Sequence, residues 1–300
     1  MSTPPKILLL GKNGQVGREL QRSLASARVV ALDRPELDFE RLDELRAIVR
    51  REAADVIVNA AAYTAVDRAE AEPAICRRIN ADAVAAVATE ARSLGSLLVH
   101  YSTDYVFDGT KKGWYEETDE PKPLGVYGMT KLEGERAAAS AGRHLVFRTS
   151  WIYAAHGHNF IRTMLRLGRE RDELRVVDDQ FGVPTAARLI AEVTAACIGR
   201  LATGTHPSSG VYHLAPHGET TWCRFARVIL AEARKQGVPL RCPPENVVGI
   251  GTADYPLPAR RPANSRLDTT KLETALNIRP PEWQDDVPVV VAALVAESSS

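Results

Sequence analysis

The chain has 300 residues, of which 45% are hydrophobic and 25% are charged. This composition is typical of a folded globular protein that is long enough for one large domain or two modest ones. Lysine plus arginine and aspartate plus glutamate both number 38, so the net charge is zero. The basic surface of a nucleic-acid-binding protein is therefore not expected.

No segment of the chain is predicted to cross a membrane. The sequence reaches the apolar run 7–10 without a signal region and cleavage site ahead of it. The longest apolar stretch near the C-terminal end, 289–296, is far shorter than the roughly 20 residues that a membrane-spanning helix needs. We therefore expect a soluble cytoplasmic protein with neither a membrane nor a nucleic acid as a partner.

The four cysteines show no pattern of a metal site or a disulfide framework. They are Cys76, Cys197, Cys223 and Cys242. None belongs to a CxxC pair, and no cysteine–histidine cluster has zinc spacing. His156 and His158 offer only two nearby ligands. We expect free thiols in a reducing compartment and no bound metal.

The first half of the chain alternates short apolar runs with longer helical patterns. Strands are expected at 7–10, 28–32, 56–58, 97–101 and 145–148, and helices at 14–26, 42–51, 73–94 and 128–140. This alternation predicts an α/β fold with a Rossmann-type, doubly wound parallel sheet covered on both faces by helices. Such sheets bind ligands beyond the carboxyl ends of their strands.

The alternation is less regular after Trp151, which predicts a smaller C-terminal domain. Helices are expected at 160–171, 187–201, 221–236 and from about Pro288, strands near 175–177 and 211–214, and turns in the proline-rich segment 239–262. We assign residues 1–150 to a dinucleotide-binding domain and residues 151–300 mainly to substrate binding. A strand near 174–180 is expected to rejoin the first domain.

A glycine-rich turn at the first strand–helix junction is suited to binding a dinucleotide diphosphate. Gly11 can turn the chain sharply, Gly14 lets the backbone approach a phosphate, and Gly17 lets the helix pack closely on the sheet. The helix N-terminus then offers unpaired N–H groups to the anion. The spacing is GxxGxxG rather than GxGxxG.

Charged residues after the second strand favour different cofactors. Asp33, about 20 residues beyond the turn, can bind ribose hydroxyls and favours NADH, whereas Arg34 can pair with the 2′-phosphate of NADPH. A carboxylate at Asp38 can reach the adenine amino group or remain solvated. The sequence leaves both NADPH and NADH open.

Tyr127 and Lys131 have the spacing of an acid–base pair on one helix face. A nearby ammonium stabilises a phenolate, so we expect Lys131 to lower the pKa of Tyr127. Tyr127 would protonate the alkoxide that forms when hydride reaches a carbonyl carbon. Thr103, after the fourth strand, would donate to the same oxygen, and Ser102 should point the other way.

These motifs belong to longer segments that are spread over nearly the whole length of the chain: 11–17, 59–67, 101–109, 127–133, 148–153, 179–185 and 261–265. On these segments the chain resembles the extended short-chain dehydrogenase/reductase superfamily and, within it, the dTDP-4-dehydrorhamnose reductase family. The segments NAAAYTAVD (59–67) and YSTDYVFDG (101–109) are more specific than the generic superfamily pattern.

The resemblance implies roles for individual residues. Thr103, Tyr127 and Lys131 match the catalytic triad of the family. The residues expected to bind the cofactor are Gly11, Gly14, Gln15, Val16, Asp33, Arg34, Asp38, Phe39, Ala62, Tyr63, Thr64, Tyr101, Tyr127 and Lys131. Those expected to bind the substrate are Thr103, Asp104, Tyr105, Trp151 and Arg260, with Arg261 as a second candidate for the diphosphate. Trp151 would pack its indole face on the sugar or, alternatively, belong to the core between the domains.

One position departs from the family. Some members are thought to dimerise through glutamates that chelate magnesium, and Glu19 matches one such position, but Arg188 stands at another. An arginine cannot ligate magnesium, which takes oxygen ligands. We therefore expect a monomer or a weak dimer and no metal-bridged dimer.

The activity implied by the resemblance is NADPH- or NADH-dependent reduction of the C4 ketone of dTDP-4-dehydro-6-deoxy-L-mannose to dTDP-L-rhamnose. The partner is then a nucleotide sugar. Two alternatives stay open from the sequence: a reductase or epimerase of another nucleotide sugar, and a non-catalytic regulatory subunit resembling the β subunit of methionine adenosyltransferase.

Overall fold

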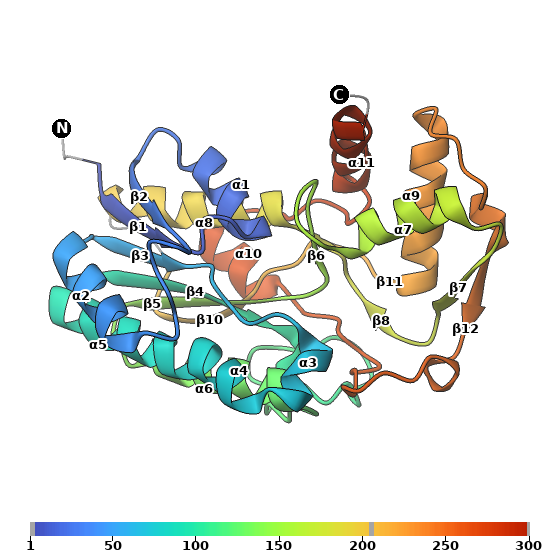
Figure 1. Cartoon of the computed structure of the whole chain (residues 1–300). Helices are drawn as coiled ribbons and strands as arrows, with labels where there is room; N and C mark the ends of the chain where they lie inside the picture. Colours follow the sequence, from blue (N-terminus) through green and yellow to red (C-terminus); the bar gives the residue numbers. More distant parts are fainter. Residues whose placement is uncertain (1–3, 204–206, 299–300) are drawn as a thin grey trace.

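The computed structural model describes residues 4–203 and 207–298, and its centre is a six-stranded sheet (Figure 1). The strands lie in the order β10-β5-β4-β3-β1-β2, and every neighbouring pair is parallel. They are β1 (Lys6–Leu10), β2 (Arg28–Leu32), β3 (Val56–Asn59), β4 (Leu97–Thr103), β5 (His144–Thr149) and β10 (Gly210–His213). The central strands are nearly continuous apolar runs because helices cover both of their faces. The expected α/β class is confirmed.

Helices cover the sheet in two layers. One layer consists of α1 (Gln15–Ser23), α8 (Ala187–Gly199) and α10 (Thr270–Leu276), and the other of α2 (Leu42–Glu52), α5 (Ala83–Leu94) and α6 (Val126–Ala139) (Figure 1). Successive strand residues enter opposite cores, so Ile7 and Leu9 pack with the first layer and Leu8 and Leu10 with the second.

A π-helical turn interrupts the segment 73–94, which the sequence predicts as one helix. The segment forms α4 (Pro73–Arg77), the π turn η1 (Arg78–Asp82) and α5, and it follows the short helix α3 (Val66–Ala71). The turn carries the buried Asn80, whose amide donates to the carbonyl oxygen of Tyr63 (3.1 Å) and accepts from its N–H group (2.8 Å). The turn thereby fixes the loop that follows β3.

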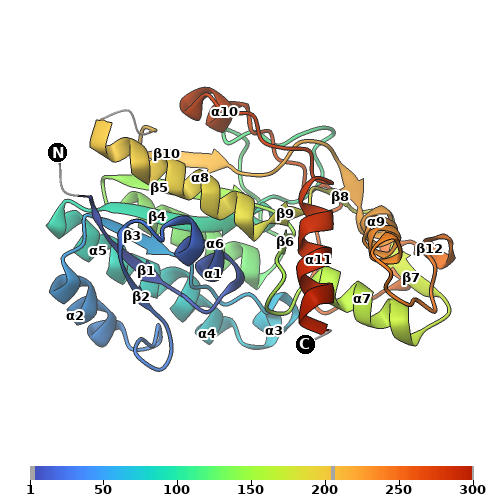
Figure 2. The same cartoon turned by 90° about the horizontal axis from the view of Figure 1, so that it is seen from above.

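A smaller lobe lies at one end of the sheet (Figure 2). Its helices and strands are β6 (Ile152–Tyr153), α7 (Phe160–Glu170), β7 (Leu174–Val177), β8 (Phe181–Gly182), β9 (Thr185–Ala186), β11 (Thr220–Thr221), α9 (Trp222–Lys235), β12 (Val247–Ile250) and α11 (Asp286–Ser298). Short 3-10 helices occur in both lobes: η2 (Asp104–Val106) follows β4 and η3 (Arg200–Thr203) follows α8, whereas η4 (Pro244–Asn246) and η5 (Thr252–Asp254) flank β12. The core of the lobe is apolar, with Ile161, Phe225 and Val291 fully buried.

The cysteines and the helices bear on two further expectations from the sequence. All four cysteines are buried free thiols, as predicted. Among residues 4–203 and 207–298, no helix is long and apolar enough to span a membrane.

The strand that completes the central sheet is β10, not the expected strand near 174–180. β7 lies at that position, but it pairs with β12 in a separate two-stranded sheet of the smaller lobe. β12 itself lies in the segment 239–262, where only turns were expected. The C-terminal half also sends α8 and α10 onto the larger lobe. A boundary at residue 150 therefore does not divide the chain into its two lobes.

The direction of winding reverses at β1, because β2 lies on one side of it and β3 on the other. Gly11 leaves β1 at this point with a φ of +88°, and a Cβ on it would lie 2.6 Å from the backbone nitrogen of Ala61. A Cβ on Gly17 would lie 2.0 Å from the carbonyl oxygen of Gly11. Only glycine allows these approaches, which bring the N-terminus of α1 to the edge where open α/β sheets bind ligands.

Replacing Gly17 with alanine should destabilise the fold, because the added methyl group would overlap the carbonyl oxygen of Gly11. We expect the free energy of unfolding to fall by about 2 kcal/mol or more. The matched control is Gly199→Ala at the end of α8, where a Cβ would meet no atom within 4 Å. Equal stability of the two variants in urea would contradict the close packing at Gly17.

Candidate active site

Reactive side chains gather at the carboxyl edge of the sheet, where β4 ends. The hydroxyl of Thr103 donates to Asp104 Oδ1 (3.0 Å) and accepts from the backbone N–H of Tyr105 (3.2 Å). The hydroxyl of Ser102 instead donates to Glu135 Oε1 of α6 (2.5 Å). Thr103 and Ser102 therefore point in different directions, as the alternation of side chains along a strand predicts.

Tyr127 lies in the first turn of α6, and its hydroxyl is desolvated. Burial and the nearby Asp104 carboxylate raise the pKa of Tyr127, while a hydrogen bond with Thr103 opposes the rise. The prediction that Lys131 lowers this pKa is wrong, because the ammonium points elsewhere. It donates to the carbonyl oxygen of Tyr101 (2.6 Å).

Lys131 is nearly inaccessible, with 2% of its surface exposed. Burial lowers the pKa of its ammonium to about 8, and the carboxylate of Glu135, one turn further along α6, opposes that shift. Glu135 is in turn held by Arg148 of β5 through hydrogen bonds of 2.9 and 2.8 Å. In the sequence, the i,i+4 spacing from Lys131 is the only local sign of Glu135, and Arg148 stands out only as the first residue of the segment 148–153.

Asp104 is buried beside Tyr127 and Tyr105. In the described part of the chain, its Oδ2 atom has no hydrogen-bond partner. Burial raises the pKa of the Asp104 carboxyl group to about 6. The ring of Tyr105 packs edge-on against Tyr127, with the centroids 5.5 Å apart and the planes at 80°. The side chains at the end of β4 and the start of α6 thus form one compact group: Thr103, Asp104, Tyr105 and Tyr127. The two hydroxyl groups expected to act on one carbonyl oxygen, those of Thr103 and Tyr127, belong to it.

At the glycine-rich turn, Asp33 binds the backbone. Its two carboxylate oxygens accept the N–H groups of Asn13 (3.0 Å) and Arg34 (2.8 Å). The guanidinium of Arg34 forms ion pairs with Asp38 (3.2 Å) and Glu40 (2.7 Å). Asp33 therefore shapes the turn, and Arg34 and Asp38 are partners within one surface cluster.

The other expected cofactor residues differ in exposure. After β3, Ala62 and Tyr63 are half-buried and Thr64 is exposed. The ring of Phe39 is buried in an apolar core. The hydroxyl of Tyr101 bonds to Thr194 of α8 (2.8 Å), so its ring belongs to the sheet core and its carbonyl faces Lys131. Contacts of these residues with a cofactor stay a prediction.

A cavity of about 970 Å³ lies in the smaller lobe, bordered by α7, β7 and the segment 252–261. The residues that line it include Arg171, Arg175 and Arg260. Arg261 also lines it, but this side chain forms an ion pair with Asp67 of α3 (2.8 Å). Of the two expected arginines, Arg260 is the exposed one and the better placed for an anionic ligand.

Trp151 is packed between elements. One face of its indole is covered by Trp222 of α9, with the ring centroids 3.7 Å apart and the planes at 15°. Gly182 approaches the same indole so closely that a Cβ on it would lie 2.7 Å away. Trp151 is half-buried, and its contact with a sugar stays a prediction. Trp222 lines the cavity, and no local motif in the sequence distinguishes it.

Arg188 lies among carboxylates at the start of α8. It forms ion pairs with Asp286 of α11 and with Glu192 (3.2 Å). The hydrogen bond to Asp286 is the main reason that its pKa is raised, and the charge of Glu19 contributes. Among the described residues, no three or more His, Cys, Asp or Glu side chains are grouped so that they could hold a metal ion.

Replacing Asp104 with asparagine should stabilise the protein at neutral pH. The carboxyl group binds its proton more tightly in the folded than in the unfolded chain, so the wild type loses stability as pH rises through about 6. Asparagine has no charge to bury. The stability advantage of the variant should grow by a few kcal/mol between about pH 4 and about pH 8, since one pKa unit corresponds to about 1.4 kcal/mol. Urea unfolding measures it, and an advantage that does not change with pH would contradict the shift.

Comparison with known proteins identifies relatives along the whole chain. The family model described as RmlD substrate binding domain matches residues 5–296. The dTDP-4-dehydrorhamnose reductase of Escherichia coli K12 is 49% identical, covering 93% of this chain and 94% of the relative. The enzyme of that name from Burkholderia thailandensis is 48% identical, covering 97% of this chain and all of the relative.

Solved structures agree with these relatives. The Bacillus anthracis dTDP-4-dehydrorhamnose reductase in complex with NADP superposes with a TM-score of 0.87 at 30% identity, covering 98% of this chain and 100% of that one. A dTDP-4-dehydrorhamnose reductase from Clostridium acetobutylicum has the same TM-score at 34% identity, covering 97% and 99%. The match of the family model and the identity to full-length relatives show that the chain belongs to the RmlD substrate-binding-domain family, that of the dTDP-4-dehydrorhamnose reductases.

Proposed function

We propose that this chain reduces the C4 ketone of dTDP-4-dehydro-6-deoxy-L-mannose to give dTDP-L-rhamnose, using NADPH or NADH. The observation that carries the proposal is the grouping of Thr103 and Tyr127 at the same sheet edge as the glycine-rich turn. The names of the full-length relatives and the NADP in the Bacillus anthracis structure support it.

The turn fits a dinucleotide diphosphate. Helix α1 begins after the exposed Gly14, and no side chain caps its N-terminus, so the first N–H groups remain available to an anion. The glycine at position 17 lets this helix end approach the sheet edge. A bound nicotinamide would supply the hydride for the reduction.

The side chains of the chain supply the proton and hold the oxygen. Tyr127 is kept protonated by burial and by the Asp104 charge, so its hydroxyl can donate a proton to the C4 oxygen as negative charge develops there. Thr103 would offer a second hydroxyl to this oxygen by turning its proton away from Asp104, to which it donates in the absence of substrate. Lys131 adds a buried positive charge near the site and would hold the nicotinamide ribose.

The substrate nucleotide is proposed to occupy the cavity of the smaller lobe. Guanidinium groups suit a diphosphate because they donate two parallel hydrogen bonds and keep their charge. Arg260 is our first candidate for this contact, and Arg175 is another arginine of the same lining. Trp222 offers an aromatic surface in the same cavity.

Oxidation of NADPH, and separately of NADH, should follow addition of enzymatically generated dTDP-4-dehydro-6-deoxy-L-mannose, with dTDP-rhamnose as the product. Tyr127→Phe should retain dinucleotide binding and lose at least about 100-fold in turnover, because the proton donor is removed. Absorbance at the nicotinamide band measures turnover, and product chromatography identifies dTDP-rhamnose. Fluorescence titration measures dinucleotide binding. Dinucleotide binding without oxidation by the wild type would point to another nucleotide sugar or to a regulatory subunit.

We further propose that the protein is a monomer or a weak dimer without a bridging metal. The Arg188 guanidinium already supplies a positive charge between Asp286 and Glu192, where a cation would otherwise be needed. Its charge would also repel a divalent ion near Glu19.

Chelation should therefore leave the molar mass in solution unchanged. Multi-angle light scattering with excess magnesium and with excess EDTA measures it over a range of protein concentrations. A dimer that dissociates in EDTA and re-forms in magnesium would contradict the proposal.

A further inference from the structure

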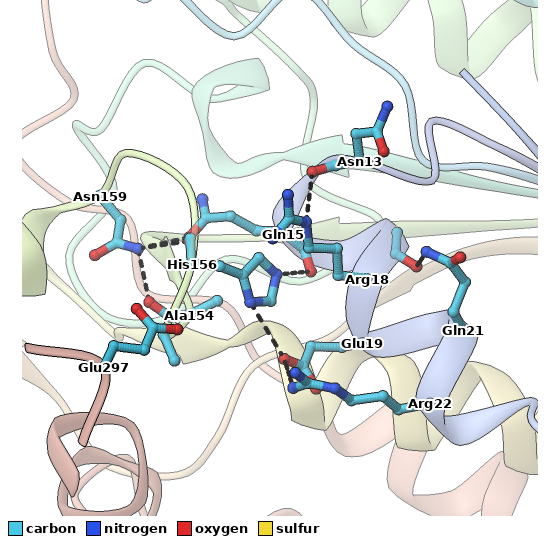
Figure 3. A network of polar contacts seen from close by, with 12 residues as sticks. Asn13, Gln15, Arg18, Glu19, Gln21, Arg22, Ala154, His156, Asn159 and Glu297 are labelled. Atoms are coloured by element: carbon cyan, nitrogen blue, oxygen red, sulfur yellow. Dashed lines mark hydrogen bonds and ion pairs between the residues drawn. The ribbon is translucent and has the colours of Figure 1, made fainter. Parts of the chain in front are cut away.

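Two hydrogen bonds join the glycine-rich turn to the loop before α7 in the smaller lobe (Figure 3). The Nε2 atom of His156 lies 3.1 Å from the backbone carbonyl oxygen of Gln15, and Nδ2 of Asn159 lies 2.9 Å from the side-chain oxygen of Gln15. His156 and Asn159 are each only 7% exposed. Gln15 is thus held at two points from the other lobe.

The orientation of the Asn159 amide follows from its other contacts. Its Oδ1 accepts the backbone N–H of Arg162 (3.1 Å) and so caps the N-terminus of α7. Its Nδ2 faces the carbonyl oxygens of Ala154 (2.8 Å) and His156 (3.3 Å), which can only accept. Asn159 must therefore present a donor to Gln15.

The orientation of the Gln15 amide follows in turn. Because Asn159 donates, Gln15 must offer its oxygen, and its NH₂ group lies on the far side of the amide (Figure 3). This NH₂ group makes no hydrogen bond with the described residues in either lobe. Gln15 is the first residue of α1 and is half-buried, so its side chain starts from the helix end whose backbone N–H groups no side chain caps.

We propose that Asn159 is a positioning residue for the dinucleotide, which turns the NH₂ group of Gln15 toward the diphosphate. This inference rests on the proposed function, which places the dinucleotide at the glycine-rich turn. The amide donor would add one directed hydrogen bond to the negative charge already attracted by the helix N-terminus. Asn159 also lines the cavity of the smaller lobe, so one side chain touches both proposed binding sites.

The backbone of the loop limits the freedom of Gln15 as well. Gly157 has a φ of +72°, and a Cβ on it would lie 3.1 Å from Cγ of Gln15. Here the loop approaches the stem of the side chain while Asn159 binds its tip. A side chain at position 157 would therefore crowd Gln15, while the hydrogen bond from Asn159 orients its amide.

Asn159→Asp reverses this orientation while it preserves the cap of α7. The aspartate can only accept, so Gln15 would turn its NH₂ group toward position 159 and present its oxygen to the diphosphate. We expect the affinity for NADPH, measured by fluorescence titration, to fall roughly ten-fold. The new carboxylate would also face the carbonyl oxygens of Ala154 and His156, so the melting temperature of the ligand-free protein should fall, and the variant that leaves these contacts intact is Gln15→Glu. Gln15→Glu keeps the acceptor for Asn159 but replaces the donor, and it should weaken NADPH binding to a similar degree without touching the cap.

A double-mutant cycle separates positioning from a merely structural role. Asn159→Ser adds no charge, can still cap α7 and is too short to reach Gln15, so it should weaken NADPH binding a few-fold in the wild-type background. In a Gln15→Ala background the same substitution should have no further effect. An equal loss in both backgrounds, or wild-type affinity in Asn159→Asp and Gln15→Glu, would overturn the inference. A wild type that binds no dinucleotide would overturn the proposed function and this inference with it.

Discussion

The meeting of three backbone segments at the end of β1 is the constraint on which the rest of the site depends. Gly11, Gly17 and Ala61 approach one another so closely that side chains at the two glycines have no room. This contact is steric, so it fixes α1 relative to the sheet without any directed bond. The carboxylate of Asp33 then fastens the turn by accepting the N–H of Asn13. The uncapped N-terminus of α1, where we propose that the diphosphate binds, is thereby held at the sheet edge.

A second constraint lies beneath the catalytic helix, where charges are buried. Lys131 is nearly inaccessible, and Glu135 and Arg148 below it are paired in a region with almost no exposed surface. A buried ion pair gains little net stability, because desolvation offsets most of the attraction. Its contribution is to hold α6 against β5 in one register, since either charge left alone would be strongly unfavourable. The position of Tyr127, one turn before Lys131, follows from that register.

The sequence predicts what depends on local pattern and misses what depends on distant contacts. The strands of the sheet, the glycine-rich turn and the opposite directions of Ser102 and Thr103 follow from periodicity and spacing. The runs 174–177 and 211–214 look alike as short apolar segments, and only their tertiary partners decide which one joins β5. In the same way, the spacing of Tyr127 and Lys131 predicts that both lie on one helix face. It does not predict that the ammonium of Lys131 donates to the carbonyl oxygen of Tyr101.

The electrostatics of the site keep Tyr127 in the protonated form that a reduction needs. A reductase needs its acid protonated before the hydride arrives, whereas the reverse oxidation needs the phenolate. Burial and the carboxylate of Asp104 both disfavour the phenolate of Tyr127, so the phenol is the resting form. The alkoxide that forms at C4 is far more basic than a phenolate, so the raised pKa of Tyr127 still leaves proton transfer downhill. A tyrosine that is a weak acid in the resting protein can therefore serve as the proton donor of this reaction.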